Sequence, residues 1–79
     1  MVRILFLGPL RDDAGAEHRD VPGPLDWAGL LQAVGPEVRD ALLDDRVNVA
    51  CAGRVLVDKS MLHADGEDEV ALLPPVSGG

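Results

Sequence analysis

The alternation of apolar and polar positions along the 79-residue chain predicts strands at both ends and a helix between them. Val2 to Leu7 is a short apolar run stopped by Gly8-Pro9, which indicates a buried strand. Glu17 to Val21 alternates and indicates its hairpin partner. The connection from Leu10 to Ala16 is expected to hold a helical turn or a loop, with Gly15 as the breaker.

The middle of the chain has helical spacing. Asp26 is a favourable N-cap residue before an apolar stripe, and Gly35-Pro36 either ends the helix or kinks it. The stripe consists of Trp27, Leu30, Leu31 and Val34, and it continues through Val38, Ala41, Leu42 and Leu43 as far as Asp44-Asp45. We interpret Trp27, the only tryptophan, as a core residue.

The second half returns to strand patterns. Val47 to Cys51 alternates, and Ala52-Gly53 leads into Arg54 to Val57. This pattern predicts a hairpin, although Asn-Gly would be the stronger turn signal. The remaining expected segments are a connector over Asp58 to His63 from which Met61 and Leu62 reach the core, a tight turn at Asp65-Gly66, and a last strand over Glu69 to Leu73.

This order of elements predicts an α+β fold, with a mixed sheet of about five strands packed on one main helix. The first and last strands are the most apolar, so we expect them to be central and parallel, because parallel strands are usually covered on both faces. A helix held by such a sheet is the β-grasp, or ubiquitin-like, arrangement. We expect this domain over residues 1–73.

The last six residues, Pro74-Pro75-Val76-Ser77-Gly78-Gly79, combine a stiff stem with a thin end. Prolines favour an extended polyproline conformation, in which six residues at about 3.1 Å each reach roughly 19 Å. Glycine has no Cβ, so the end would fit a narrow channel. Residues 74–79 are therefore expected to form a flexible tail that presents a C-terminal carboxylate to the active site of another protein.

Composition narrows the classes of function. One cysteine excludes an internal disulfide and suits a reducing compartment. Fourteen acidic residues against seven basic ones give a net charge of −7, which disfavours a nucleic-acid or anionic-membrane partner. The start of the chain lacks a signal-peptide pattern, and no apolar run approaches about 18 residues. We therefore expect a soluble, cytoplasmic protein.

Few side chains could perform catalysis. His18 and His63 are isolated, without metal-ligand spacing, and Cys51 falls on an apolar strand phase as a small core residue. Gly8-Pro9 ends a strand and lacks the pattern of a phosphate-binding loop. Lys59 is the only lysine, so the chain offers few amines of its own to an activated terminal carboxylate. We expect no metal or cofactor bound by this chain.

The chain resembles the molybdopterin synthase small subunit, a MoaD-type sulfur carrier of the ubiquitin-like β-grasp family. The resemblance rests on the opening Val2 to Leu7 with Arg11, on the strand from Asp68 to Leu73 after Asp65-Gly66, and above all on the final Pro-Pro-Val-Ser-Gly-Gly. It spans essentially the whole chain. Family members often carry Asn near the hairpin where this chain has Ala52-Gly53.

This resemblance implies a mechanism and two partners. An adenylyltransferase/sulfurtransferase would use ATP to adenylate Gly79, and a sulfur donor would convert it to a thiocarboxylate. The tail would then enter the large synthase subunit, in a heterotetramer, and give its sulfur to a cyclic pyranopterin precursor to form the dithiolene of molybdopterin. This chain would be the non-catalytic sulfur donor, and the catalytic residues would lie on the large subunit. Gly78, which has no side chain, would leave the Gly79 carboxylate unhindered.

Strand phase and the resemblance together predict a docking surface. If Ile4 and Phe6 point inward, Leu7 points outward, and the same alternation turns Leu73 outward beside the tail. Val55 is the third expected member. The predicted partner-binding residues are Leu7, Val55, Leu73, Pro74, Pro75, Val76 and Ser77.

Three alternatives stay open. A sulfur carrier for thiamine synthesis or tRNA thiolation would share the fold and the tail, although the double proline argues against the thiamine version. A ubiquitin-like protein modifier would also end in diglycine and would form isopeptides on target lysines. An unmodified β-grasp binding module would not need its terminal glycines.

Overall fold

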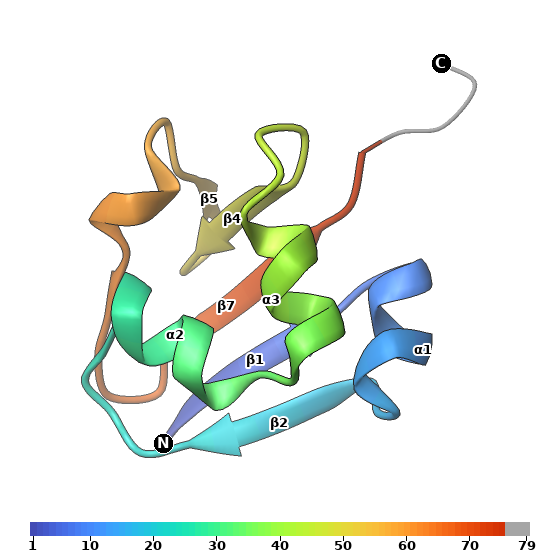
Figure 1. The fold of residues 1–79 in the computed structure, drawn as a ribbon. Coiled ribbons are helices and arrows are strands. Elements are labelled where there is room, and N and C mark those ends of the chain that lie inside the picture. The colour runs from blue at the N-terminus through green and yellow to red at the C-terminus, as the bar shows by residue number, and fades with distance from the viewer. Residues whose placement is uncertain (76–79) are drawn as a thin grey trace.

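The computed structural model describes residues 1–75, which form a five-stranded sheet, a two-stranded ribbon and three α-helices (Figure 1). The strands of the main sheet run in the order β2-β1-β7-β4-β5. The strands are β1 (Val2–Phe6), β2 (His18–Val21), β4 (Asn48–Cys51), β5 (Arg54–Val55) and β7 (Glu69–Leu73), and the ribbon pairs β3 (Leu25–Asp26) with β6 (His63–Ala64). The helices are α1 (Pro9–Ala14), α2 (Trp27–Ala33) and α3 (Pro36–Leu42), with a 3₁₀ turn η1 (Lys59–Met61).

The first and last strands lie side by side and run parallel, as predicted, and β7 is the middle strand of the sheet. Their register pairs Arg3 with Glu69 and Phe6 with Leu72. β2 and β4 flank this pair in antiparallel orientation, and β5 closes the far edge. The α+β, β-grasp arrangement predicted from the order of elements is therefore confirmed.

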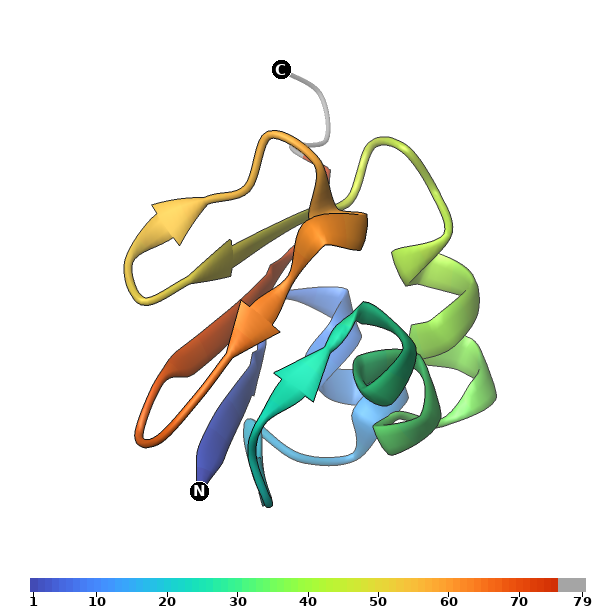
Figure 2. The same cartoon turned by 90° about the vertical axis from the view of Figure 1, so that its left-hand side faces the viewer.

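The core lies between the sheet and the helices, which cover one face of it (Figure 2). Alternation along the strands puts one side of each in this core, so Ile4, Phe6, Val70 and Leu72 are fully or almost fully buried. Among residues 1–75 no polar or charged side chain is buried. The buried residues are Val2, Ile4, Phe6, Leu10, Leu25, Leu30, Val34, Val38, Leu42, Val47, Val49, Leu62, Ala64, Val70 and Leu72.

Two short helices take the place of one main helix. Asp26 caps α2 as predicted, because its carboxylate accepts a hydrogen bond from the Gly29 amide at 2.7 Å. α2 ends at Ala33, and the backbone is extended at Val34 and Gly35. Proline disfavours a helical conformation in the residue before it but suits the first position of a new helix. Pro36 therefore ends one helix and begins the next.

Two arginines satisfy the free carbonyl groups at the end of α2. Arg19 donates to the Ala33 carbonyl at 2.7 Å, and Arg39 donates to the carbonyls of Leu31 at 2.9 Å and Val34 at 3.4 Å. The last carbonyls of a helix have no partner within the helix and carry its partial negative charge. These cations from β2 and α3 therefore fix α2 against its neighbours.

Three local expectations are settled by the structure. Gly15 ends α1 with a left-handed φ of 72°, as a breaker should. Leu62 is buried, but the prediction for Met61 is wrong, because the 3₁₀ turn leaves its side chain 74% exposed. The strand expected over Arg54 to Val57 is shorter, since β5 contains Arg54 and Val55 alone.

None of the helices in residues 1–75 is long and apolar enough to cross a bilayer.

Candidate carrier tail and docking face

The tail begins where the middle strand ends. Leu73, the last residue of β7, pairs with Asn48 of β4, and the chain then continues into Pro74, which is half-buried, and Pro75, which is exposed. This point lies beside the β1–α1 connection and the loop before β4 (Figure 1). The predicted site residues Val76, Ser77, Gly78 and Gly79 lie outside the described residues.

The sheet face opposite the helices carries a row of apolar side chains. The register places Leu5, Ala71, Ala50 and Val55 in line across four strands. These residues alternate with the buried ones, so they point away from the core. Leu73 lies two residues beyond Ala71 on the same face, and continuing the β1–β7 register by one residue brings Leu7 level with it. We call Leu5, Leu7, Ala50, Val55, Ala71 and Leu73 the outer apolar face.

The predicted docking trio is placed on this face, but its members do not form one cluster. Leu7 is 40% exposed and Leu73 half-buried, and both lie at the tail. Val55 is 58% exposed and lies on β5, with β4 between it and β7. Ala50 and Ala71 lie between the two ends of this face. They were not predicted as part of it, because a small residue does not mark an apolar surface in the sequence. The pairing register of the hairpin could have found them.

A charged row borders the outer apolar face on the side away from the tail. Arg3 lies between Asp20 and Glu69 in register, and its Nε donates to the Asp20 carboxylate at 3.0 Å. This hydrogen bond lowers the pKa of Asp20 and raises that of Arg3. The face therefore changes from charged at one end to apolar at the other, where the tail begins.

A family model described as the ThiS family matches residues 4–79 of the chain. The chain belongs to the ThiS family. It is thus a ubiquitin-like protein of the sulfur-carrier family, and the resemblance to MoaD-type carriers is confirmed at the level of the family. None of the curated proteins matches the chain in sequence.

Solved structures support the same fold for this ThiS-family chain. Small archaeal modifier protein 1 from Haloferax volcanii is 26% identical, with a TM-score of 0.68 and coverage of 99% of this chain and 98% of that one. Small archaeal modifier protein 1 from Methanosarcina acetivorans is 22% identical, with a TM-score of 0.74 and coverage of 99% and 95%. A Pyrococcus furiosus protein given the name molybdopterin converting factor, subunit 1, is 20% identical, with a TM-score of 0.64 and coverage of 95% and 97%.

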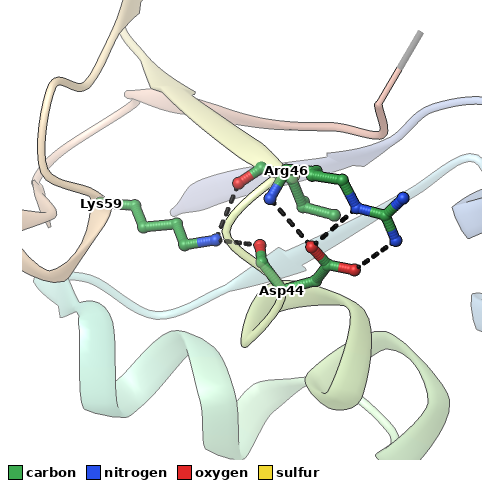
Figure 3. A network of polar contacts seen from close by, with 4 residues as sticks. Asp44, Arg46 and Lys59 are labelled. Carbon is green, nitrogen blue, oxygen red and sulfur yellow. Dashed lines mark hydrogen bonds and ion pairs between the residues drawn. The ribbon is translucent and has the colours of Figure 1, made fainter.

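The only lysine of this ThiS-family chain holds the loop next to the tail (Figure 3). The half-buried Lys59 donates from Nζ to the carbonyls of Asp44 at 2.6 Å and Val47 at 2.8 Å. The ammonium also lies 5.9 Å from the centre of the Trp27 ring, within range of a cation–π interaction. To react as a nucleophile, this amine would have to leave both carbonyls and free the loop that leads into β4.

Asp44 closes the same network from the other side (Figure 3). Its carboxylate accepts hydrogen bonds from the Arg46 backbone amide at 2.9 Å, from Nε at 3.2 Å and from Nη2 at 2.9 Å. These interactions with Arg46 lower the pKa of Asp44 to about 2. The loop from Leu43 to Val47 is thereby cross-linked immediately before Asn48, the partner of Leu73.

The other candidate side chains do not assemble a reactive site. Cys51 packs against the core, as predicted, and burial raises the pKa of its thiol, with a smaller contribution from Asp68. His18 and His63 are both exposed. In the part of the chain that the structure describes, no group of three His, Cys, Asp or Glu side chains could hold a metal ion.

Proposed function

We propose that this protein is a sulfur carrier of molybdenum cofactor biosynthesis whose reactive group is the C-terminal carboxylate of Gly79. The observation that carries the proposal is the place of the tail. β7, the middle strand, leads directly into Pro74-Pro75 beside the apolar end of the outer face. Family membership over residues 4–79 and the final Pro-Pro-Val-Ser-Gly-Gly support it.

The proposed reaction takes place on partner enzymes. The Gly79 carboxylate attacks the α-phosphate of ATP on an adenylyltransferase, and pyrophosphate leaves. A donor at the sulfide level attacks the acyl carbon of the adenylate, AMP leaves, and Gly79 becomes a thiocarboxylate. Inside the large subunit of molybdopterin synthase this sulfur passes to a cyclic pyranopterin precursor, and water restores the carboxylate. Leu7, Val55 and Leu73 dock the domain, while Pro74 to Ser77 span the distance to the reacting atoms and Gly78 keeps the end thin.

Intact mass spectrometry tests the terminal chemistry. Protein from cells with the pathway intact should contain a species in which one oxygen is replaced by sulfur, and the same mass shows that the chain ends at Gly79. Deleting Gly79 should abolish this species and sulfur transfer in a reconstituted synthase assay. The thermal melt should not change, because the buried core of residues 1–75 ends at Leu72. Dithiolene formation by the truncated chain would rule out the carrier role.

A graded pair of substitutions tests the need for a thin end. Gly78→Val should be nearly as damaging as deletion, since a β-branched residue widens the end and restricts the backbone. Gly78→Ala adds one methyl group and should fall between Gly78→Val and the native chain. Equal activity of all three would show that no narrow channel receives the tail.

A protein-modifier role is the second candidate, and the similarity to two proteins named small archaeal modifier protein 1 favours it. Such a modifier would join Gly79 to amines of other proteins. Immunoblots of cell extract should then show high-mass conjugates that disappear when Gly79 is deleted. A carrier restricted to sulfur transfer should give the free chain alone. Conjugates formed on this chain's own Lys59 would require the ammonium to leave the Asp44 and Val47 carbonyls.

A further inference from the structure

Gly8 lies against the first residue of the tail. It follows β1 with φ of 56° and ψ of −135°, and a Cβ built on it would come 3.2 Å from Cγ of Pro74. The parallel register explains this contact, because both residues lie two positions beyond the paired Phe6 and Leu72. Nothing in the family match or in the sequence pattern assigns Gly8 a role beyond ending the strand.

We infer that Gly8 is a positioning residue: the space beside it receives the Pro74 ring, and this contact sets the direction in which the tail leaves the sheet. We call the contact between Gly8 and the Pro74 ring the Gly8 seat. This inference rests on the proposed carrier function. Proline has a fixed φ, so the placement of its ring also determines where the following residues point. With Pro75 next in the chain, a displacement at the Pro74 ring is carried outward by a second stiff residue.

The backbone conformation at Gly8 favours glycine by itself, and the contact with Pro74 is a second reason that the other positive-φ glycines lack. Gly15 and Gly53 also have positive φ, of 72° and 83°, but a Cβ on either would meet no atom of residues 1–75 within 4 Å. A Cβ at Gly8 would meet Pro74 at a distance tighter than nine in ten real contacts, so the ring would have to move by a few tenths of an ångström. Gly8 therefore supplies both the turn before α1 and the space that the proline ring occupies.

A double-mutant cycle separates the contact from the backbone strain. Alanine at position 8 is strained whatever residue stands at 74, whereas its clash needs the proline ring. Gly8→Ala should therefore raise the unfolding equilibrium constant about three- to tenfold more in the native chain than in Pro74→Ala. Gly15→Ala combined with Pro74→Ala is the matched control, and its effects should be additive. If the effects of Gly8→Ala and Pro74→Ala on stability were additive, Gly8 would not position the Pro74 ring, and the inference would be overturned.

Sulfur transfer tests what the seat does. Thiocarboxylate-loaded protein, prepared chemically so that no activating enzyme is needed, is mixed with the large synthase subunit in single-turnover experiments. Gly8→Ala should slow transfer about tenfold or more, because small misplacements of a reacting group are costly, while calorimetric affinity changes less than about twofold. Gly15→Ala should transfer at the native rate. Unchanged transfer by Gly8→Ala would overturn the positioning role.

Two readouts keep this test independent of the proposed function. If the native loaded protein gives no sulfur to the large subunit, the carrier proposal fails, and the folding cycle still tests the seat. If Gly8→Ala does not fold, NMR of the native protein decides. Nuclear Overhauser contacts between the Gly8 α-protons and the Pro74 ring protons are expected, and their absence would overturn the inference.

Discussion

At the scale of single residues, folding lowers the pKa of the Asp44 carboxyl group. It accepts three hydrogen bonds from Arg46, which lower its pKa to about 2. An aspartate in an unfolded chain titrates at about 3.9. Because the folded value is the lower one, the native state gains stability from Asp44 above about pH 4 and loses it as the pH falls towards 2.

Denaturant unfolding of the native chain and of Asp44→Asn between pH 2 and 5 measures this contribution. We expect the free energy of unfolding to fall less steeply with acid in Asp44→Asn than in the native chain. Arg46→Met removes the hydrogen-bond donors of the side chain and should flatten the same limb, because the Asp44 pKa then moves back towards its ordinary range. Identical slopes in all three chains would show that this network does not hold in solution.

Some residue roles are readable from the sequence and others are not, and the difference is the distance along the chain to their partners. Asp26 was predicted as an N-cap because its partner, Gly29, is three residues away. The role of Lys59 was not predicted, since its carbonyl partners Asp44 and Val47 lie 15 and 12 residues earlier. The contact between Gly8 and Pro74 was not predicted for the same reason, since the two residues are far apart in the sequence. Contacts of this kind exist only once the strands have paired.

At the scale of elements, the hairpin between β4 and β5 contains local strain that can be relieved. Cys51 pairs with Arg54, which leaves Ala52 and Gly53 as a two-residue turn with φ of 52° and 83°. Two consecutive positive φ angles are the mark of a type I′ turn, in which asparagine is favoured at the first position. A left-handed conformation costs most residues about 1–2 kcal/mol, and asparagine less.

Ala52→Asn should therefore stabilise the protein, by about 0.5–1 kcal/mol, with an unchanged denaturant slope. Ala28→Asn is the control, because Ala28 is exposed within α2, where asparagine is a poorer helix former than alanine. It should destabilise by roughly half a kcal/mol. Opposite shifts of the two denaturation midpoints are expected. A loss of stability in Ala52→Asn would contradict the turn assignment.

The elements themselves were largely predictable, and the exceptions follow from competition between neighbouring signals. All four strands that form or flank the parallel pair, β1, β2, β4 and β7, were expected, because each is bounded by a turn signal on the correct side. Of the two alternatives left open at Gly35-Pro36, a kink or an end, the structure has the end, because the proline breaks the backbone there although the apolar spacing continues through it. Val57 continues the strand pattern of β5 but is fully exposed, since the chain turns towards η1.

At the scale of the whole molecule, helices cover one side of the sheet (Figure 2), and the register places the outer apolar face on the other side. Alternation predicted which strand residues point outward, but only the register shows that Ala50 and Ala71 join Leu5 to Val55. With a net charge of −7, the molecule should be attracted to a basic partner, and under the proposed carrier function an apolar contact near the tail would fix the docked position.

Leu73 is the residue at which docking and folding can be told apart, because it ends β7 at the tail yet is only half-buried. Leu73→Asp should weaken binding to the large synthase subunit by about 2 kcal/mol or more, as expected when a charge enters an apolar anchor site. The isolated domain should lose much less stability, since the side chain points away from the core. Calorimetric titration and a thermal melt of the same variant measure the two effects.

Val57→Asp is the matched control for Leu73→Asp. It adds the same charge at an exposed apolar residue that lies outside the outer apolar face. Its affinity for the large subunit should stay close to that of the native chain. An equal loss in both variants would mean that overall charge, rather than contact at Leu73, weakens binding. Unchanged affinity in Leu73→Asp, or a collapsed melt with affinity intact per folded molecule, would remove Leu73 from the docking surface and leave the tail as the recognised element.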